Sequence, residues 1–330
     1  MSHRPSLSVV IPMFDEADNV IPMLEGVHQG LIGYGGDWEL ICVDDGSRDG
    51  TGEALRTAAE GFGPHVRVIC LRRNFGQTAA MQTGIEAARG ELIATLDGDL
   101  QNDPGDIPRL VDELLERDLD LLQGWRRDRQ DDLIRKIPSR IANRLIARVT
   151  GVRLHDYGCS LKVYRAAVIK QVQLFGEMHR FIPVWVANVT DPRRIGETRV
   201  RHHARRFGRS KYGLSRTFRV VLDLLAAFFF LRYRYRPGHF FGSIGLILGA
   251  VGVLAMAWLT WVKFVLGEDI GQRPLLFVAI LLLVASVQFL TTGVLAEMLT
   301  RTFYASSGGA AHALAWQSDP QRAGWKRPSP

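Results

Sequence analysis

Short apolar runs alternate with stretches of helical spacing along the chain up to about residue 125. The apolar runs are rich in Val, Ile and Leu and predict strands at Leu7–Pro12, Trp38–Asp44, Val66–Leu71, Glu91–Asp97 and Leu119–Gln123. In the intervening stretches apolar residues recur every three or four positions, which predicts helices at Glu16–Gln29, Thr51–Ala59, Gln77–Ala88 and Asp106–Glu116. This alternation favours an α/β fold with a doubly wound, mostly parallel sheet, whose ligands bind beyond the carboxyl ends of the strands.

Two later runs, His239–Val262 and Pro274–Ala296, are nearly free of charge. Each is longer than the roughly 20 residues that a helix needs to span a bilayer, so we expect two transmembrane helices within a region of residues 237–304. A pair of helices buried in a soluble core is the alternative. Gly245 and Gly249 form a GxxxG pattern in the first run, which favours close helix packing.

The remaining segments complete the expected organisation around a globular domain of residues 1–212. Leu133–Val149 has helical spacing. Ser215–Leu231 also has it, but is too short and too charged to span a membrane, so we expect juxtamembrane amphipathic helices over residues 213–236. An internal helix of the globular domain is the alternative there. The tail, residues 305–330, is rich in Gly, Ser, Ala and Pro and is predicted to be disordered.

The charge distribution gives an orientation to the two apolar runs. The net charge is +7, and Arg and Lys residues crowd the segment Arg199–Arg236, just before the first run. The loop Lys263–Arg273 carries two basic and two acidic residues, and Arg301 follows the second run. The positive-inside rule then places both termini and the globular domain in the cytoplasm. We expect the inner, or cytoplasmic, membrane as the location. A nucleic-acid-binding protein would explain the basic charge but not the two apolar runs.

An acidic motif follows the fourth predicted strand. Asp97, Asp99 and Gln101 stand at every second position, so their side chains converge if the chain stays extended. Three such oxygen donors suit Mg²⁺ or Mn²⁺ with open positions for phosphates, which indicates a nucleotide diphosphate site. A polar turn after a strand is the alternative. Asp44 and Asp45 lie at another predicted strand end, and acidic strand ends of one sheet can form one cleft.

Six motifs follow one another along the chain: Pro12–Glu16, Asp44–Ser47, Arg73–Gln77, Asp97–Gln101, Gly124–Asp131 and Arg205–Tyr212. Taken in this order, they resemble the motifs of the polyprenyl-phosphate glycosyltransferases, a membrane-attached branch of glycosyltransferase family 2. Phe14 and Asp15 depart mildly from the usual Tyr and Asn. Each motif is weak alone, but the six in the family's order, followed by a juxtamembrane segment and two apolar runs, are specific. The resemblance covers nearly the whole chain and implies a GT-A-type fold.

The resemblance also implies an activity and its site. The reaction would be inverting transfer of a sugar from a UDP- or GDP-sugar to undecaprenyl or dolichyl phosphate, with Mg²⁺ or Mn²⁺ as cofactor and the lipid bilayer as partner. The implied metal ligands are Asp97, Asp99 and Gln101. The implied nucleotide-binding residues are Pro12, Phe14, Glu16, Asp44, Asp45, Arg73, Asp97 and Gly98. The implied phosphate-binding residues are Arg126, Arg129, Ser139, Arg205, Ser210 and Lys211.

Asp99 and Asp156 are the implied catalytic residues. A polyprenyl phosphate is mostly deprotonated near neutral pH, because by analogy with phosphoserine its second pKa is about 6, so a strong base is unnecessary. We therefore expect Asp156 to orient groups or stabilise positive charge on the anomeric carbon at least as much as it removes a proton. A carboxylate that caps a turn is the alternative. Glu177–Pro183 either shapes the sugar or acceptor pocket or forms a structural turn.

Other functions stay open at this point. A processive or single-addition glycosyltransferase with a non-polyprenyl acceptor is one, although the chain lacks the Q-x-x-R-W motif and the further spans of processive synthases. A non-catalytic membrane protein that binds lipid phosphate is the other. The sugar also stays open between glucose, mannose, galacturonic acid and formamido-arabinose, and so does homo-oligomer formation.

Overall fold

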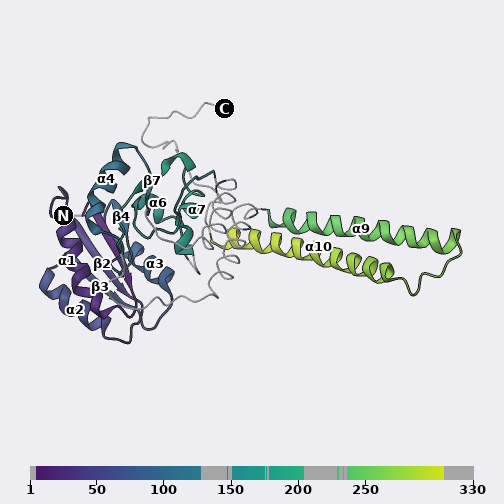
Figure 1. The fold of residues 1–330 in the computed structure, drawn as a ribbon, viewed down its shortest axis with the longest axis horizontal. Helices are drawn as coiled ribbons and strands as arrows, with labels where there is room; N and C mark the ends of the chain where they lie inside the picture. Colours follow the sequence, from purple (N-terminus) through teal and green to yellow (C-terminus); the bar gives the residue numbers. More distant parts are fainter. Residues whose placement is uncertain are drawn as a thin grey trace, which may run out of the picture. The chain divides into compact units, whose positions relative to one another are not determined.

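The computed structural model describes residues 5–127, 147, 151–174, 176, 178–203, 229, 233 and 236–307 (Figure 1). The chain divides into two compact units, Met1–Leu225 and Ala226–Pro330. The predicted helix Leu133–Val149 and the predicted juxtamembrane helices over residues 213–236 lie almost wholly outside the described residues.

One sheet forms the centre of the first unit, with strand order β3-β2-β1-β4-β6-β5-β7. Its strands are β1 (Leu7–Met13), β2 (Trp38–Asp44), β3 (Val66–Cys70), β4 (Leu92–Thr95), β5 (Leu121–Trp125), β6 (Lys162–Arg165) and β7 (Ile195–Arg199). Among the described strands, β6 alone runs antiparallel to its neighbours β4 and β5. The prediction of a mostly parallel α/β sheet is therefore confirmed, although β6 and β7 were not predicted.

Helices cover both faces of this sheet, as the doubly wound pattern requires. The longer ones are α1 (Val20–Leu31), α2 (Thr51–Phe62), α3 (Gln77–Ala87) and α4 (Ile107–Glu116). The shorter ones are η1 (Ala17–Asn19), η2 (Pro104–Asp106), α6 (Ala166–Ile169), η3 (Met178–Phe181), α7 (Ile182–Val186) and η4 (Pro192–Arg194). Apolar residues of α1, α2 and α4 share one buried cluster with alternate residues of β1, while α3 lies on the other side of the strands (Figure 1).

A glycine brings α3 close to the sheet. A Cβ atom at Gly84 would lie 2.3 Å from the side chain of Val10 and 3.2 Å from that of Val43. Real Cβ atoms do not approach that closely, so α3 reaches this depth only because Gly84 has no side chain. This contact holds the later part of α3 against β1 and β2.

The second unit contains two long helices, α9 (Pro237–Val265) and α10 (Pro274–Ser307). Both are long and apolar enough to cross a membrane, and most of their apolar side chains, such as Leu254 and Phe264, are exposed. A soluble core would bury these side chains, so the structure favours the two membrane-spanning helices over that alternative. The helix α10 also includes the first residues of the predicted tail, because the first helix-breaking residues, Gly308 and Gly309, come after Ser307.

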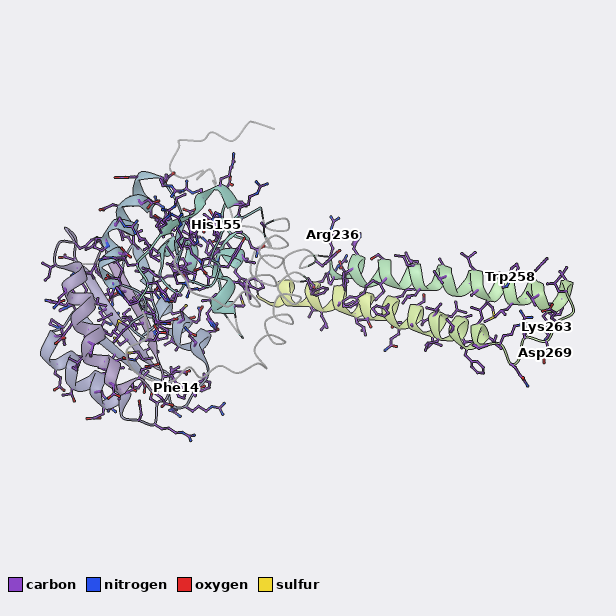
Figure 2. All side chains as sticks on the ribbon, in the orientation of Figure 1. Phe14, His155, Arg236, Trp258, Lys263 and Asp269 are labelled. Carbon is purple, nitrogen blue, oxygen red and sulfur yellow. The ribbon has the colours of Figure 1, made fainter. Side chains whose placement is uncertain are left out.

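Small residues form the contact between α9 and α10. A Cβ atom at Gly245 would lie 2.9 Å from a Leu290 side-chain atom, and one at Gly249 would lie 2.6 Å from the hydroxyl of Ser286. That hydroxyl donates to the carbonyl oxygen of Gly245 at 2.7 Å. The predicted close packing at the GxxxG pattern is confirmed, and the partner is the other helix of the same chain. Trp258 lies toward the α9–α10 connection (Figure 2) and stacks on Trp261.

Candidate active site

Among the residues that the structure describes, the polar side chains singled out from the sequence come mainly from the carboxyl edge of the sheet. The parallel strands β1, β2, β4 and β5 all end there, and the antiparallel strand β6 begins there. The loops after these strands therefore lie along one edge, where an open α/β sheet holds its ligands. Phe14 and His155, labelled in Figure 2, come from loops at separate parts of this edge.

A pocket of about 680 Å³ opens at the ends of β1, β2 and β3. Its lining includes Phe14, Asp44, Ser47, Arg72 and Arg73. The mixture of a ring, a carboxylate and guanidinium groups suits a ligand that has a flat base, hydroxyl groups and phosphates. The volume and the lining chemistry together fit a nucleotide.

The turn after β2 is held by its own acidic residues. Oδ1 of Asp44 accepts the backbone N–H of Ser47 at 3.1 Å and also its hydroxyl, while the Ser47 hydroxyl oxygen accepts the N–H of Asp15 at 2.9 Å. Gly46 has φ of +68°. A Cβ atom there would lie 2.3 Å from the backbone of Arg73, so only glycine lets these two loops approach.

Asp45 has a different orientation from Asp44. Its two carboxylate oxygens accept the N–H groups of Phe75 and Gly76 at 2.8 and 2.9 Å. Burial raises the pKa of Asp45, against the lowering effect of these two bonds. Asp45 therefore fixes the loop before α3, in which the Arg73 guanidinium lies 4.8 Å from the centre of the Phe75 ring.

The acidic motif forms a turn, not an extended strand. The strand β4 ends at Thr95, and the backbone of Gly98, Asp99 and Leu100 turns, with a positive φ of 59° at Leu100. The condition for convergence by strand alternation, that the chain stays extended through Gln101, is therefore not met, because the strand ends at Thr95 and the backbone turns from Gly98 onward. Asp99 Oδ1 accepts the N–H of Gln101 at 3.2 Å, as in the alternative of a polar turn.

Asp97 still lies close to Asp99 at the start of this turn. Partial burial and the nearby Asp99 carboxylate raise the pKa of Asp97 to about 6. Its carboxylate accepts the side-chain amide of Gln77, at the start of α3, at 2.6 Å, and it also hydrogen-bonds Ser160. Two carboxylates that repel each other form a site for positive charge.

The donors present fit a divalent cation. The described residues contain no group of three His, Cys, Asp or Glu side chains that could enclose a metal ion. Mg²⁺ commonly takes one or two carboxylates together with waters and substrate phosphates, so Asp97 and Asp99 are sufficient protein ligands for it. Gln101 follows them in the same turn and is partly exposed.

Asp156 and Arg126 form a direct ion pair. Nε of Arg126 donates to Oδ2 of Asp156 at 2.7 Å, and Nη2 donates to Oδ1 at 3.0 Å. The two side chains are only 12% and 13% exposed. Gly158 donates its N–H to the same carboxylate at 3.1 Å. The predicted catalytic carboxylate and one predicted phosphate ligand are thus a single bidentate unit, whose orientation is fixed before any ligand binds.

A buried lysine that the sequence analysis did not select lies beside this unit. Lys162 is the first residue of β6, is 2% exposed, and donates from Nζ to the carbonyl oxygen of Cys159. Burial lowers the pKa of Lys162, and the nearby Asp97 and Asp156 carboxylates counter part of this effect. The signal in the sequence was a single Lys within the run Leu161 to Tyr164.

Some predicted residues lie away from the pocket or outside the described chain. Pro12 is buried in β1, and Glu16 bonds to Asn19; neither lines the pocket. Gly98 packs against Met13, where a Cβ atom would come within 2.8 Å of the Met13 side chain. The predicted phosphate ligands outside the described residues are Arg129, Ser139, Arg205, Ser210 and Lys211. Within Glu177–Pro183, His179 bonds Thr78 of α3 at 2.7 Å, which brings this segment against the site.

Comparisons with known proteins show which family the chain resembles. The model of glycosyl transferase family 2 matches residues 8–173. The dodecaprenyl-phosphate galacturonate synthase of Rhizobium johnstonii is 60% identical over 299 residues, which cover 90% of this chain and 88% of that protein. The undecaprenyl-phosphate 4-deoxy-4-formamido-L-arabinose transferase of Pseudomonas aeruginosa is 35% identical over 298 residues, which cover 90% of this chain and 86% of that protein.

Solved structures share the fold. Glucosyl-3-phosphoglycerate synthase from Mycobacterium tuberculosis, in complex with Mg²⁺ and uridine diphosphate, superimposes with a TM-score of 0.54 at 18% identity, over 69% of this chain and 79% of that one. The complex of that enzyme with Mn²⁺, uridine diphosphate and glucosyl-3-phosphoglycerate gives a TM-score of 0.52 at 16% identity, over 69% of this chain and 80% of that one.

Proposed function

The chain belongs to glycosyl transferase family 2, and we propose that it transfers a sugar from a nucleotide-sugar donor to a polyprenyl phosphate at the cytoplasmic face of the inner membrane. The observation that carries this proposal is the match to two polyprenyl-phosphate sugar enzymes over 90% of the chain. That match is too long for the globular unit alone and extends into the two apolar helices. It favours a lipid-linked acceptor over the non-polyprenyl acceptor and over a non-catalytic protein.

The pocket at β1, β2 and β3 would hold the nucleotide of the donor. Asp44 would accept hydrogen bonds from the base or the ribose, because a carboxylate selects N–H and O–H groups. The Phe14 ring would lie against the base. Arg72 and Arg73 would contact the diphosphate, since guanidinium groups match phosphate oxygens. The donor would be a UDP- or GDP-sugar.

A divalent cation, Mg²⁺ or Mn²⁺, would be held by Asp97 and Asp99 and would neutralise the charge that develops on the departing diphosphate. Other residues of the chain already bond both carboxylates. Gln77 and Ser160 fix the Asp97 carboxylate, and the N–H of Gln101 fixes that of Asp99. Gln101, in the same turn, would supply a further oxygen ligand. These bonds hold both carboxylates in place without waiting for the donor.

The acceptor oxygen would attack the anomeric carbon from the side opposite the leaving diphosphate. A new carbon–oxygen bond forms there, the bond to the nucleoside diphosphate breaks, and the configuration inverts. A polyprenyl phosphate is mostly deprotonated near neutral pH, so little proton transfer is needed. Asp156 would stabilise positive charge on the anomeric carbon, and Arg126 would attract the acceptor phosphate while it orients Asp156.

Sequence similarity also supports a class of sugar. The identity is 60% to the galacturonate synthase but 35% to the formamido-arabinose transferase. We therefore favour a uronic acid as the transferred sugar. The two apolar helices would anchor the enzyme, with both termini in the cytoplasm and the Lys263–Arg273 loop outside, by the positive-inside rule.

The test is a transfer assay with the full-length protein in detergent. The protein is incubated with Mn²⁺, undecaprenyl phosphate and labelled UDP-galacturonate, UDP-glucose or GDP-mannose, and label in the organic phase is measured. We expect transfer from the uronate donor, loss of transfer with EDTA, and loss with Asp99→Asn but not with Asp112→Asn, which alters an exposed carboxylate of α4. Transfer that survives both EDTA and Asp99→Asn refutes the mechanism, and absence of transfer from every donor refutes the function.

A further inference from the structure

Four polar residues form a line across the sheet beneath the candidate active site. The strand register pairs Thr95 of β4 with Lys162 of β6, Lys162 with Gln123 of β5, and Gln123 with Glu197 of β7. Residues paired in register project their side chains to the same face of a sheet. These residues, the polar row, therefore run side by side over four neighbouring strands.

Each member of the polar row bonds one or more groups of the same loop, residues 155–160. Thr95 Oγ1 donates to the carbonyl oxygen of Ser160 at 3.1 Å, and Lys162 Nζ donates to that of Cys159. Gln123 Nε2 donates to the carbonyl oxygen of Asp156. At the other end, Glu197 accepts the backbone N–H of His155 at 2.8 Å and also contacts the His155 ring. The loop is thus attached to the sheet along its whole length.

Burial of these polar side chains lowers the stability of the fold. Thr95 and Gln123 are fully buried, and Lys162 is 2% exposed. Among the described residues, the side-chain oxygen of Gln123 has no hydrogen-bond partner. An apolar row would fill the same space without desolvating an ammonium group or leaving a buried acceptor unpaired. Polar side chains at these positions therefore point to a purpose beyond packing.

The row acts most directly on Asp156. The carbonyl oxygen of Asp156 accepts from Gln123, and the N–H of the preceding residue, His155, donates to Glu197, so the backbone is held at Asp156 and at the residue before it. The carboxylate that extends from this backbone is then bound by Arg126 and by Gly158. A shift of the loop would move the carboxylate and the guanidinium group together.

We propose that the polar row is a positioning device that sets the Asp156 carboxylate and, through it, the Arg126 guanidinium for sugar transfer. Thr95, Gln123, Lys162 and Glu197 are then positioning residues, none of which contacts the substrates. This inference rests on the proposed function, because it assumes that the Asp156 and Arg126 pair faces the reacting atoms. It adds that the position of the Asp156 carboxylate and the Arg126 guanidinium group depends on the side chains of the polar row.

A positioning role predicts a selective loss of turnover. The nucleotide pocket is lined from β1, β2 and β3 and shares no residue with the row. Gln123 bonds the loop at Asp156 and not at Ser160, which bonds Asp97, so donor binding should not change when Gln123 is altered. A misplacement of about 1 Å at reacting groups can cost about 100-fold in rate. For Gln123→Met, which keeps the length of the side chain but removes the bond to Asp156, we expect kcat to fall by about 100-fold with a donor KM within about twofold of wild type.

The experiment measures kcat and donor KM of full-length Gln123→Met and Thr95→Val in the transfer assay, and the binding of uridine diphosphate with Mn²⁺ by calorimetry. Thr95→Val keeps the shape of the side chain and tests the other end of the loop, should Gln123→Met fail to fold. The matched control is Ser8→Ala. Ser8 is also fully buried, and its hydroxyl oxygen accepts the N–H of Gly90 at 2.9 Å. This contact lies near the amino ends of the parallel strands, away from the candidate active site. This control should lose stability but keep kcat.

Three results separate the possibilities. A lower kcat in both row variants, with unchanged uridine diphosphate binding in Gln123→Met and an active control, supports the positioning role. If the folded row variants keep kcat within about twofold, or if the control loses kcat in the same proportion as its stability, the row is only structural and the inference is overturned. A wild-type protein that transfers no sugar contradicts the proposed function instead.

Discussion

The ion pair between Arg126 and Asp156 allows a quantitative test of the site. We consider Arg126→Met, Asp156→Asn and the variant that combines both. Methionine keeps much of the apolar stem of the arginine while removing its charge, and asparagine keeps the shape of the aspartate. A double-mutant cycle then isolates the energy of the pair from the other contacts of each side chain.

The geometry sets the expected magnitude. The pair has bonds of 2.7 and 3.0 Å between side chains that are 12% and 13% exposed, so solvent screens it only weakly. Removal of one partner from a buried pair costs about 3–5 kcal/mol. Because Gly158 still bonds the Asp156 carboxylate, we expect the lower end, about 3 kcal/mol for Arg126→Met. The coupling energy should be about 2 kcal/mol, within the range for residues in contact.

The assay is urea unfolding of the full-length protein in detergent, followed by tryptophan fluorescence. An exposed pair in α2, Arg56 with Glu53, provides the matched control, since its side chains are 65% and 74% exposed at a distance of 3.3 Å. Its cycle with Arg56→Met and Glu53→Gln should give less than about 0.5 kcal/mol. If the Arg126 and Asp156 cycle gives a coupling as small as this control, the pair is not a fixed unit and our reasoning is wrong.

Further predictions concern other parts of the chain. Gly46→Ala places a Cβ atom 2.3 Å from the backbone of Arg73, so the donor KM should rise by at least about tenfold, or about 1.4 kcal/mol, in the transfer assay. Burial lowers the pKa of His65 below 6.5, so urea unfolding should show stability that is fully present above pH 6.5 and decreases below it, and His65→Phe should flatten this decrease. Gly249→Leu should destabilise the α9–α10 pair by about 1–3 kcal/mol in thermal unfolding, whereas Gly242→Leu, with no atom within 4 Å of its Cβ position, should not.

Local patterns were sufficient to predict the strands and helices around the nucleotide-sized pocket. The strand Trp38–Asp44 was predicted with its observed bounds, because an apolar run with polar residues at both ends needs no distant information. The same holds for the start of α3 at Gln77, after a glycine. The two apolar helices were equally clear from composition.

The part of the fold around β6, Arg126 and Asp156 depends on contacts between distant residues, which a single sequence does not reveal. The strand β6 has only four residues and begins with Lys162, so its pattern resembles a loop until its pairing with β4 and β5 is known. The turn after β4 stood only as an alternative, because a positive φ at leucine has no sequence signal that would have favoured it. The pairing of Asp156 with Arg126 joins loops 30 residues apart and could not be inferred from spacing.

The direction of β6 has a consequence for how such enzymes diversify. The chain leaves the carboxyl edge of the sheet at Trp125 and re-enters the sheet from that same edge at Lys162. Both ends of the intervening segment are therefore anchored at one border of the scaffold. Changes of length between Arg127 and Gly151 leave Arg126 and the loop 155–160 in the sequence on either side, so an engineer can exchange this part as a cassette to test the proposed acceptor recognition while the proposed nucleotide pocket is kept.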